Sequence, residues 1–170
     1  MAQRRILTAA GAAAFTLCGT LPVIAQPGPS AQDRSFVAQA SRAGNAEVLD
    51  GRLALQKSSD PAVRRVASRM VADHSAAGAQ LASLASNEGI AAPTAPDPSD
   101  RAAMAQQHLL RGNAFNAAYL RDQESAHVKA ISLFRSEISN GSDPRIRGFA
   151  RRTLPTLQMH LQMIRAARGR

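Results

Sequence analysis

The sequence predicts an all-α protein, a four-helix bundle in which two antiparallel hairpins are joined by one long crossover that carries a short helix. Composition is the first reason: of 170 residues, 45% are hydrophobic, only 4% are aromatic, and Ala supplies 35 positions. Such a chain favours closely packed helices over a sheet. The other reasons are four long stretches with apolar residues at helical spacing and a proline-rich segment between the second and third.

The first 25 residues have the pattern of a signal peptide, so we expect an exported protein. Arg4 and Arg5 form a basic start, residues 6–21 are apolar, and Ala25 offers a small residue for cleavage. The two arginines leave general secretion and twin-arginine export both open, and an N-terminal membrane anchor is the alternative to cleavage. Residues 26–32, with two prolines, should form a flexible leader.

A bundle domain is expected over residues 33–168. Its long helices should span about residues 33–57, 61–87, 113–139 and 144–167. The links within the first pair and within the second pair are only a few residues long, so each pair should form an antiparallel hairpin.

Residues 88–112 form the expected crossover. Pro93, Pro96 and Pro98 exclude a helix from its first part. Ser99 can then cap a short helix, which Gly112 can end. One long crossover between two short hairpins is the ferritin-like plan.

The two hairpins share a repeated sequence. Residues 59–69 resemble residues 142–152, which lie 83 positions later. In both copies an Asp can cap a helix, and the Pro after it occupies a position where its missing N–H costs nothing. A duplicated hairpin explains the repeat, and a common Asp-Pro helix start is the alternative.

Polar residues interrupt the apolar stripe of each long helix at a similar height. Glu47 and His74 lie 13 and 14 residues from Asp60, at the first turn. His127 and His160 lie 16 and 17 residues from the equivalent aspartate of the second turn. All four levels agree within about one helical turn, ~5 Å. The predicted metal-ligand set is therefore Glu47, His74, His127 and His160, with Gln123, Asp73 and Glu124 as secondary candidates.

Imidazoles and a carboxylate inside a bundle can hold a single transition-metal ion, Zn, Cu, Fe or Mn. A di-iron centre is not expected, because it needs about four carboxylates and two histidines. The alternative to a metal site is a buried polar network that fixes the register of the helices. The sequence contains no Gly-x-Ser-x-Gly, phosphate-binding loop or dinucleotide fingerprint, so we assign no catalytic residue.

The net charge of the chain indicates which partners to expect. The formal net charge is +9, and +7 remains once Arg4 and Arg5 leave with the signal. Basic proteins often bind nucleic acid, but export argues against that partner and favours an anionic envelope component. The last helix offers six arginines for it: Arg145, Arg147, Arg151, Arg152, Arg165 and Arg168.

Three functions therefore stay open. We favour a binding protein of the envelope, with a metal ion at the mid-bundle cluster, over an enzyme. The first alternative is a metal-dependent redox enzyme at the same cluster, and the second is an interaction module that uses the basic face of the last helix. The ligand and the oligomeric state are left undetermined.

Several segments resemble one known family, the domain-of-unknown-function 4142 family. They are Phe36-Val37, Ala46-Glu47, Gly51-Arg52-Leu53-Ala54, Asp60-Pro61-Ala62-Val63, Met70-Val71-Ala72-Asp73-His74, Phe115-Asn116-Ala117-Ala118-Tyr119, His127 and Leu154-Pro155-Thr156-Leu157-Gln158-Met159-His160-Leu161. The resemblance covers Phe36 to Ile164 and implies an exported bacterial protein with a ferritin-like bundle, located in the periplasm. It implies no established activity. Members are often labelled predicted outer-membrane proteins, but no lipidation site supports that location here.

Overall fold

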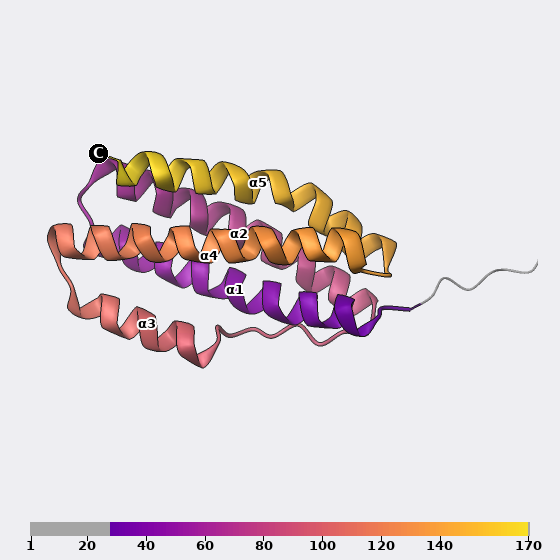
Figure 1. The fold of residues 1–170 in the computed structure, drawn as a ribbon. Coiled ribbons are helices and arrows are strands. Elements are labelled where there is room, and N and C mark those ends of the chain that lie inside the picture. Colours follow the sequence, from indigo (N-terminus) through magenta and orange to yellow (C-terminus); the bar gives the residue numbers. More distant parts are fainter. Residues whose placement is uncertain (1–27, 170) are drawn as a thin grey trace, which may run out of the picture.

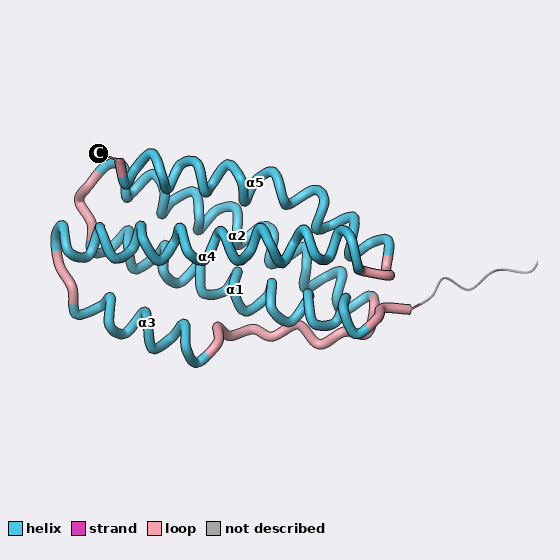
Figure 2. Tube along the Cα trace, viewed as in Figure 1, coloured by secondary structure: helices cyan, strands magenta, loops and turns pink. Residues whose placement is uncertain are grey.

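The structure, a computed structural model, describes residues 28–169 (Figures 1 and 2). Five helices and no strand occur in this range: α1 (Ala31–Lys57), α2 (Pro61–Asn87), α3 (Pro98–Leu109), α4 (Gly112–Asn140) and α5 (Pro144–Arg168). The predicted signal peptide and the first residues of the predicted leader lie outside it.

The four long helices form the bundle, and the expected hairpins and crossover are confirmed. Helix α1 pairs with α2, and α4 pairs with α5. The crossover runs back along the bundle, and α3 lies outside it beside α1 and α4 (Figure 1). A hydrogen bond from Asn45 to the carbonyl of Pro93 and an ion pair between Arg42 and Asp97 attach the crossover to α1.

Side-chain caps explain where the long helices begin. The predicted caps are confirmed, because Asp60 accepts hydrogen bonds from the backbone N–H groups of residues 62 and 63, and Asp143 does so from residues 145 and 146. Helix α1 begins at Ala31, two residues earlier than expected and within the predicted leader. Ser30 and Asp33 cause this by forming a capping box, in which each side chain accepts from the other's backbone N–H.

The ends of the crossover helix also differ from those predicted. Helix α3 begins at Pro98 after Asp97, so Ser99 lies inside it instead of capping it. Gly112 begins α4 and does not end α3. Its φ of 53° lies in the left-handed region, which glycine adopts without steric cost.

The apolar core has two parts, one toward each end of the bundle. The first contains Phe36, Phe134 and Phe149, whose ring centroids lie 4.9 to 6.4 Å apart. The second is built around Met70 and Phe115. The polar residues predicted at mid-height lie between the two clusters along the helices: Glu47 falls between Ala40 and Ala54 on α1, and His127 falls between Leu120 and Ile131 on α4.

Asp33 joins the start of α1 to the turn between α4 and α5. Its side chain is 0% exposed and accepts hydrogen bonds from the backbone N–H groups of Ser142 and Asp143 and from the Ser142 hydroxyl. Burial opposes its ionisation, but the bonds from Ser30 and Ser142 hold the pKa of Asp33 well below its usual range. Beside it, burial and the Asp33 charge raise the pKa of Glu137 to about 7.

We expect the Glu137→Gln variant to be more stable than the wild type at pH 8. Because the pKa of Glu137 is raised on folding, its contribution to stability is full below pH 4.5, the ordinary pKa, and is lost as the pH rises through about 7. Gln has no proton to lose, so the free-energy difference from the wild type should grow between pH 5 and pH 8. Urea unfolding at both pH values measures it, and an unchanged difference would contradict the assignment.

Gly51 lets α1 approach α2 closely. A Cβ atom at this position would lie 2.8 Å from Cγ2 of Val71 and 3.0 Å from the carbonyl oxygen of Ala67. We expect Gly51→Ala to lower the free energy of unfolding by about 1–3 kcal/mol, the usual cost of overpacking. The matched control is Gly44→Ala on the same helix, where nothing lies within 4 Å, and which should raise it by about 0.5–1 kcal/mol. Urea unfolding compares the two, and effects of the same sign would contradict the close approach.

Candidate metal centre

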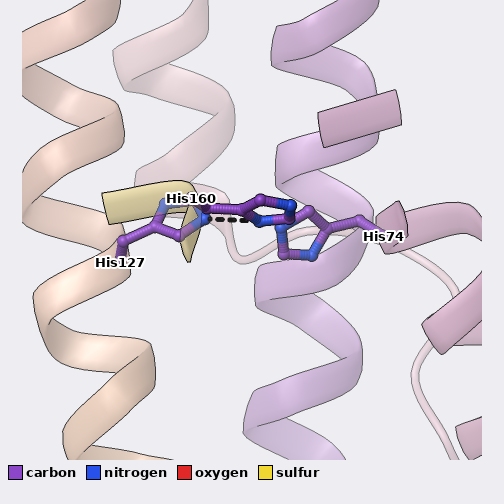
Figure 3. A group of neighbouring side chains, drawn as sticks. All are labelled: His74, His127 and His160. Carbon is purple, nitrogen blue, oxygen red and sulfur yellow. Dashed lines mark hydrogen bonds between the residues drawn. The ribbon is translucent and has the colours of Figure 1, made fainter. Parts of the chain in front are cut away.

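Three histidines from three helices meet in the middle of the bundle. His74 lies on α2, His127 on α4 and His160 on α5, and their rings face one another (Figure 3). Each can offer a ring nitrogen such that all three atoms lie within 4.8 Å of one another. His127 and His160 are 1% and 0% exposed, and His74 is partly buried. The structure thus brings together three of the four main ligands predicted from the sequence, and the fourth is Glu47.

His127 is oriented by its own helix. Its Nδ1 lies 2.9 Å from the backbone carbonyl oxygen of Gln123, one helical turn earlier. A carbonyl oxygen can only accept, so Nδ1 carries the proton and donates. In the neutral ring, Nε2 then carries a lone pair, and this is the nitrogen that faces His160.

His160 is oriented from a different helix. Its Nε2 lies 2.8 Å from Oδ2 of Asp73 on α2, and Nε of Arg69 lies 2.6 Å from the same oxygen. Arginine can only donate, so this oxygen is an acceptor, and His160 donates to it from Nε2. The lone pair of the neutral His160 ring is then on Nδ1.

The two inward nitrogens therefore face each other without a proton between them. His127 Nε2 and His160 Nδ1 are 3.3 Å apart, a hydrogen-bond distance that Figure 3 marks with a dashed line, but with both outer nitrogens donating the neutral rings have no proton left to place there. Burial lowers the pKa of His127 to about 4, and burial also lowers that of His160, although Asp73 acts against it. Both rings are thus neutral near pH 7, and two lone pairs point at each other in a buried site.

His74 completes the group. Its Nε2 is buried without a hydrogen-bond partner, and its ring centroid lies 5.6 Å from that of His127 and 5.4 Å from that of His160. Burial, followed by the two neighbouring histidines, lowers the pKa of His74 to about 3. All three rings are therefore in the neutral form that binds metal ions.

Glu47 and Gln123 lie beside the three rings and not among them. Glu47 Oε1 is 3.9 Å from Nδ1 of His127, the nitrogen that already donates to the Gln123 carbonyl. Burial raises the pKa of Glu47 to about 8, so its carboxyl group is mostly protonated at neutral pH. The fourth predicted ligand thus borders the outer side of one histidine ring.

The two secondary carboxylates have different surroundings. Asp73 touches the centre by accepting from His160. Glu124 instead binds Arg165 and Arg168 across the α4–α5 surface, and these bonds lower its pKa.

Most arginines of the predicted basic face of α5 also bond to other parts of the chain. Arg145 pairs with Glu88, and Arg147 donates to the carbonyl of Ile138, so with Arg165 and Arg168 four of the six arginines have intramolecular partners. Arg151 and Arg152 are exposed.

A cavity of about 910 Å³ adjoins the three histidines, all of which line it. Part of its wall is apolar and includes Leu81 and Phe134. The part toward α1, α3 and α4 is acidic, with Asp50, Asp100 and Asp122 as well as Glu47. Burial, followed by repulsion from Asp122 and Asp100, raises the pKa of Asp50 to about 7.

This acidic wall and the orienting role of Asp73 were not predicted from the sequence. One signal for the wall was available: Glu47 and Asp50 are three residues apart, a spacing that places them on the same face of a helix. The contribution of α3 could not be found in this way, because its position depends on the path of the crossover.

Comparisons with known proteins identify a shared fold and a family. No curated protein matches the chain. A DUF305 fragment from Deinococcus radiodurans superimposes with a TM-score of 0.75 at 16% identity, covering 84% of this chain and 99% of that one. A "putative secreted protein DUF305" from Streptomyces coelicolor gives a TM-score of 0.67 at 15% identity, covering 78% of this chain and 88% of that one. These similarities show a shared ferritin-like helical fold.

Within the described part of the chain, no helix combines the length and apolar character that crossing a membrane requires.

The sequence profile of the family "Domain of unknown function (DUF4142)" matches residues 19–167, and the resemblance inferred from the sequence is thereby confirmed. This protein, a ferritin-like bundle with three histidines at its centre, belongs to the DUF4142 family.

Proposed function

We propose that this protein binds one transition-metal ion of the Zn²⁺ type through His74, His127 and His160. The observation that carries the proposal is the pair of opposed lone pairs on His127 Nε2 and His160 Nδ1. Without a proton or a cation between them, two such nitrogens repel each other. A metal ion converts the repulsion into two coordinate bonds.

The spacing of the two nitrogens supports this proposal. With Zn–N bonds of about 2.0–2.1 Å, two nitrogens of a tetrahedral site lie about 3.3–3.4 Å apart. The distance between His127 Nε2 and His160 Nδ1 is 3.3 Å. His74 lies near enough to supply the third nitrogen by a small movement of its ring.

The groups around the rings also favour a metal. Histidines that bind metals usually donate their other N–H to a carboxylate or a backbone carbonyl. His160 donates to Asp73, and His127 donates to the carbonyl of Gln123. A buried network that served only to hold the helices in register would be expected to pair the inward nitrogens as well.

The donor set also bears on which ion binds. Imidazole suits Zn, Cu, Fe and Ni ions. Three protein ligands leave a further coordination position for water or a small molecule, and the adjoining cavity of about 910 Å³ offers room for it. A redox enzyme that uses copper or iron in this position is therefore the second candidate function.

The proposed location is the periplasm. The signal-peptide pattern of residues 1–25 supports export. The description of the Streptomyces coelicolor neighbour as a secreted protein agrees with it.

Zinc binding by the protein, purified without a His tag, tests the centre. We expect one Zn²⁺ per chain in the wild type and loss of that ion in His127→Ala and His160→Ala. The matched control is His108→Ala, which replaces the exposed fourth histidine on α3 and should bind like the wild type. Isothermal titration and metal analysis give the stoichiometry, and circular dichroism checks the fold. Equal binding in all variants, or none in the wild type, rejects the site.

The role of Asp73 gives a separate test. Asp73→Asn should raise the Kd for Zn²⁺ by about 10–100-fold, the usual effect of replacing a group that orients a metal-binding histidine. Asp97→Asn is the matched control, because Asp97 pairs with Arg42 on the surface and should leave the Kd unchanged. A Kd that does not differ between the two variants would show that Asp73 has only a structural role.

A further inference from the structure

A second group of polar side chains lines the cavity on the side of α1, α3 and α4. Glu47 and Asp50 come from α1, Gln107 from α3 and Gln123 from α4. All four offer oxygen atoms, whereas the three histidines offer nitrogen. The donor chemistry of this wall therefore differs from that of the metal centre described above.

Each of these four side chains has a buried oxygen without a hydrogen-bond partner. The atoms are Oε2 of Glu47, Oδ1 of Asp50, Oε1 of Gln107 and Oε1 of Gln123. Gln107 and Gln123 are only 4% and 1% exposed. Buried polar atoms in proteins almost always have a partner, and four unpartnered oxygens along one cavity call for a common one.

The orientation of Gln107 strengthens the argument. Its amide Nε2 donates to Oδ2 of Asp122 at 2.8 Å, and Arg121 pairs with the other oxygen of that carboxylate. The amide nitrogen is thus engaged, which leaves the carbonyl oxygen as the free end of the side chain. Asp122 therefore acts as a positioning residue for a carbonyl oxygen that borders the cavity.

We propose that this oxygen-lined wall is a second cation site, which takes a hard divalent ion of the Mg²⁺ or Mn²⁺ type. Carboxylate and amide oxygens are the donors that such ions prefer. The ion would meet the carboxylates of Glu47 and Asp50 and the carbonyl oxygens of Gln107 and Gln123. The site goes beyond the proposed function, because it shares no ligand with the three histidines.

Water completes the coordination in this site. The four side-chain oxygens leave two positions of an octahedral ion open, so water fills these positions. Mg²⁺ characteristically keeps several of its waters, and the cavity of about 910 Å³ can hold them.

Charge favours a cation over water alone. Glu47, Asp50, Asp100 and Asp122 all line the cavity, so four acidic side chains surround one space. The basic residues on the cavity wall are Arg69, Lys129 and Arg152, of which Arg69 already pairs with Asp73. A divalent ion beside Glu47 and Asp50 would take the place of their protons and balance the charge of the carboxylates.

Binding of Mn²⁺, followed by the loss of the electron paramagnetic resonance signal of the free ion, tests the proposal. We expect one Mn²⁺ per chain in the wild type, displaced by Mg²⁺, and at least about tenfold weaker binding in the Glu47→Gln/Asp50→Asn variant. Both substitutions keep side-chain size and replace a carboxyl group with an amide, so the variant should fold, and circular dichroism checks this. The single variant Asp50→Asn provides the same comparison with one change.

His160→Ala is the matched control, because it removes a nitrogen ligand of the metal centre without touching the oxygen-lined wall. It should bind Mn²⁺ like the wild type, and this result would stand even if zinc binding failed. The proposal is overturned if the wild type binds no Mn²⁺, so that the wall holds only water and protons. It is equally overturned if Glu47→Gln/Asp50→Asn binds like the wild type, or if His160→Ala loses the ion.

Discussion

The centre of this protein depends on two hydrogen bonds that two of its histidines donate from their outer ring nitrogens, the ones that point away from the other histidine. His127 donates to the carbonyl of Gln123, and His160 donates to Asp73. Each bond fixes which ring nitrogen carries the proton, so each also fixes where the lone pair points. The first bond comes from the helix itself, and the second joins α5 to α2, which makes the arrangement of the centre a direct result of how the hairpins pack.

The polar layer is maintained at a cost. It lies between two apolar clusters, and several of its buried atoms have no partner within the described residues. An unsatisfied buried polar group costs about 1–3 kcal/mol, which is large beside the 5–15 kcal/mol that stabilise a typical protein. Places where a sequence departs from ordinary core packing are often functional sites. The departure here is concentrated at mid-height, beside a cavity.

Much of the fold could be predicted from the sequence because its signals are local. Asp60 and Asp143 mark the starts of α2 and α5, and residue counts from these turns placed the three histidines at one level. The start of α1 was not predicted, because the capping box of Ser30 and Asp33 lies in a segment whose prolines suggested a loop.

The candidate site could be predicted only to the level of helix faces. Residue spacing gives the height and face of a side chain, but not the direction in which it turns. Glu47 therefore had the right height but borders the outer side of His127, while Glu124 turns to Arg165 and Arg168. The oxygen-lined wall depends on α3, whose place beside α1 and α4 results from tertiary packing that no local pattern encodes.

The three histidines come from both halves of the molecule. His74 belongs to the first hairpin, whereas His127 and His160 belong to the second. An ion held by all three would form a reversible cross-link between the hairpins near the middle of the bundle. Because the unfolded chain has no such site, binding of the ion would raise the free energy of unfolding, so that metal supply in the surroundings would set part of the stability of the fold.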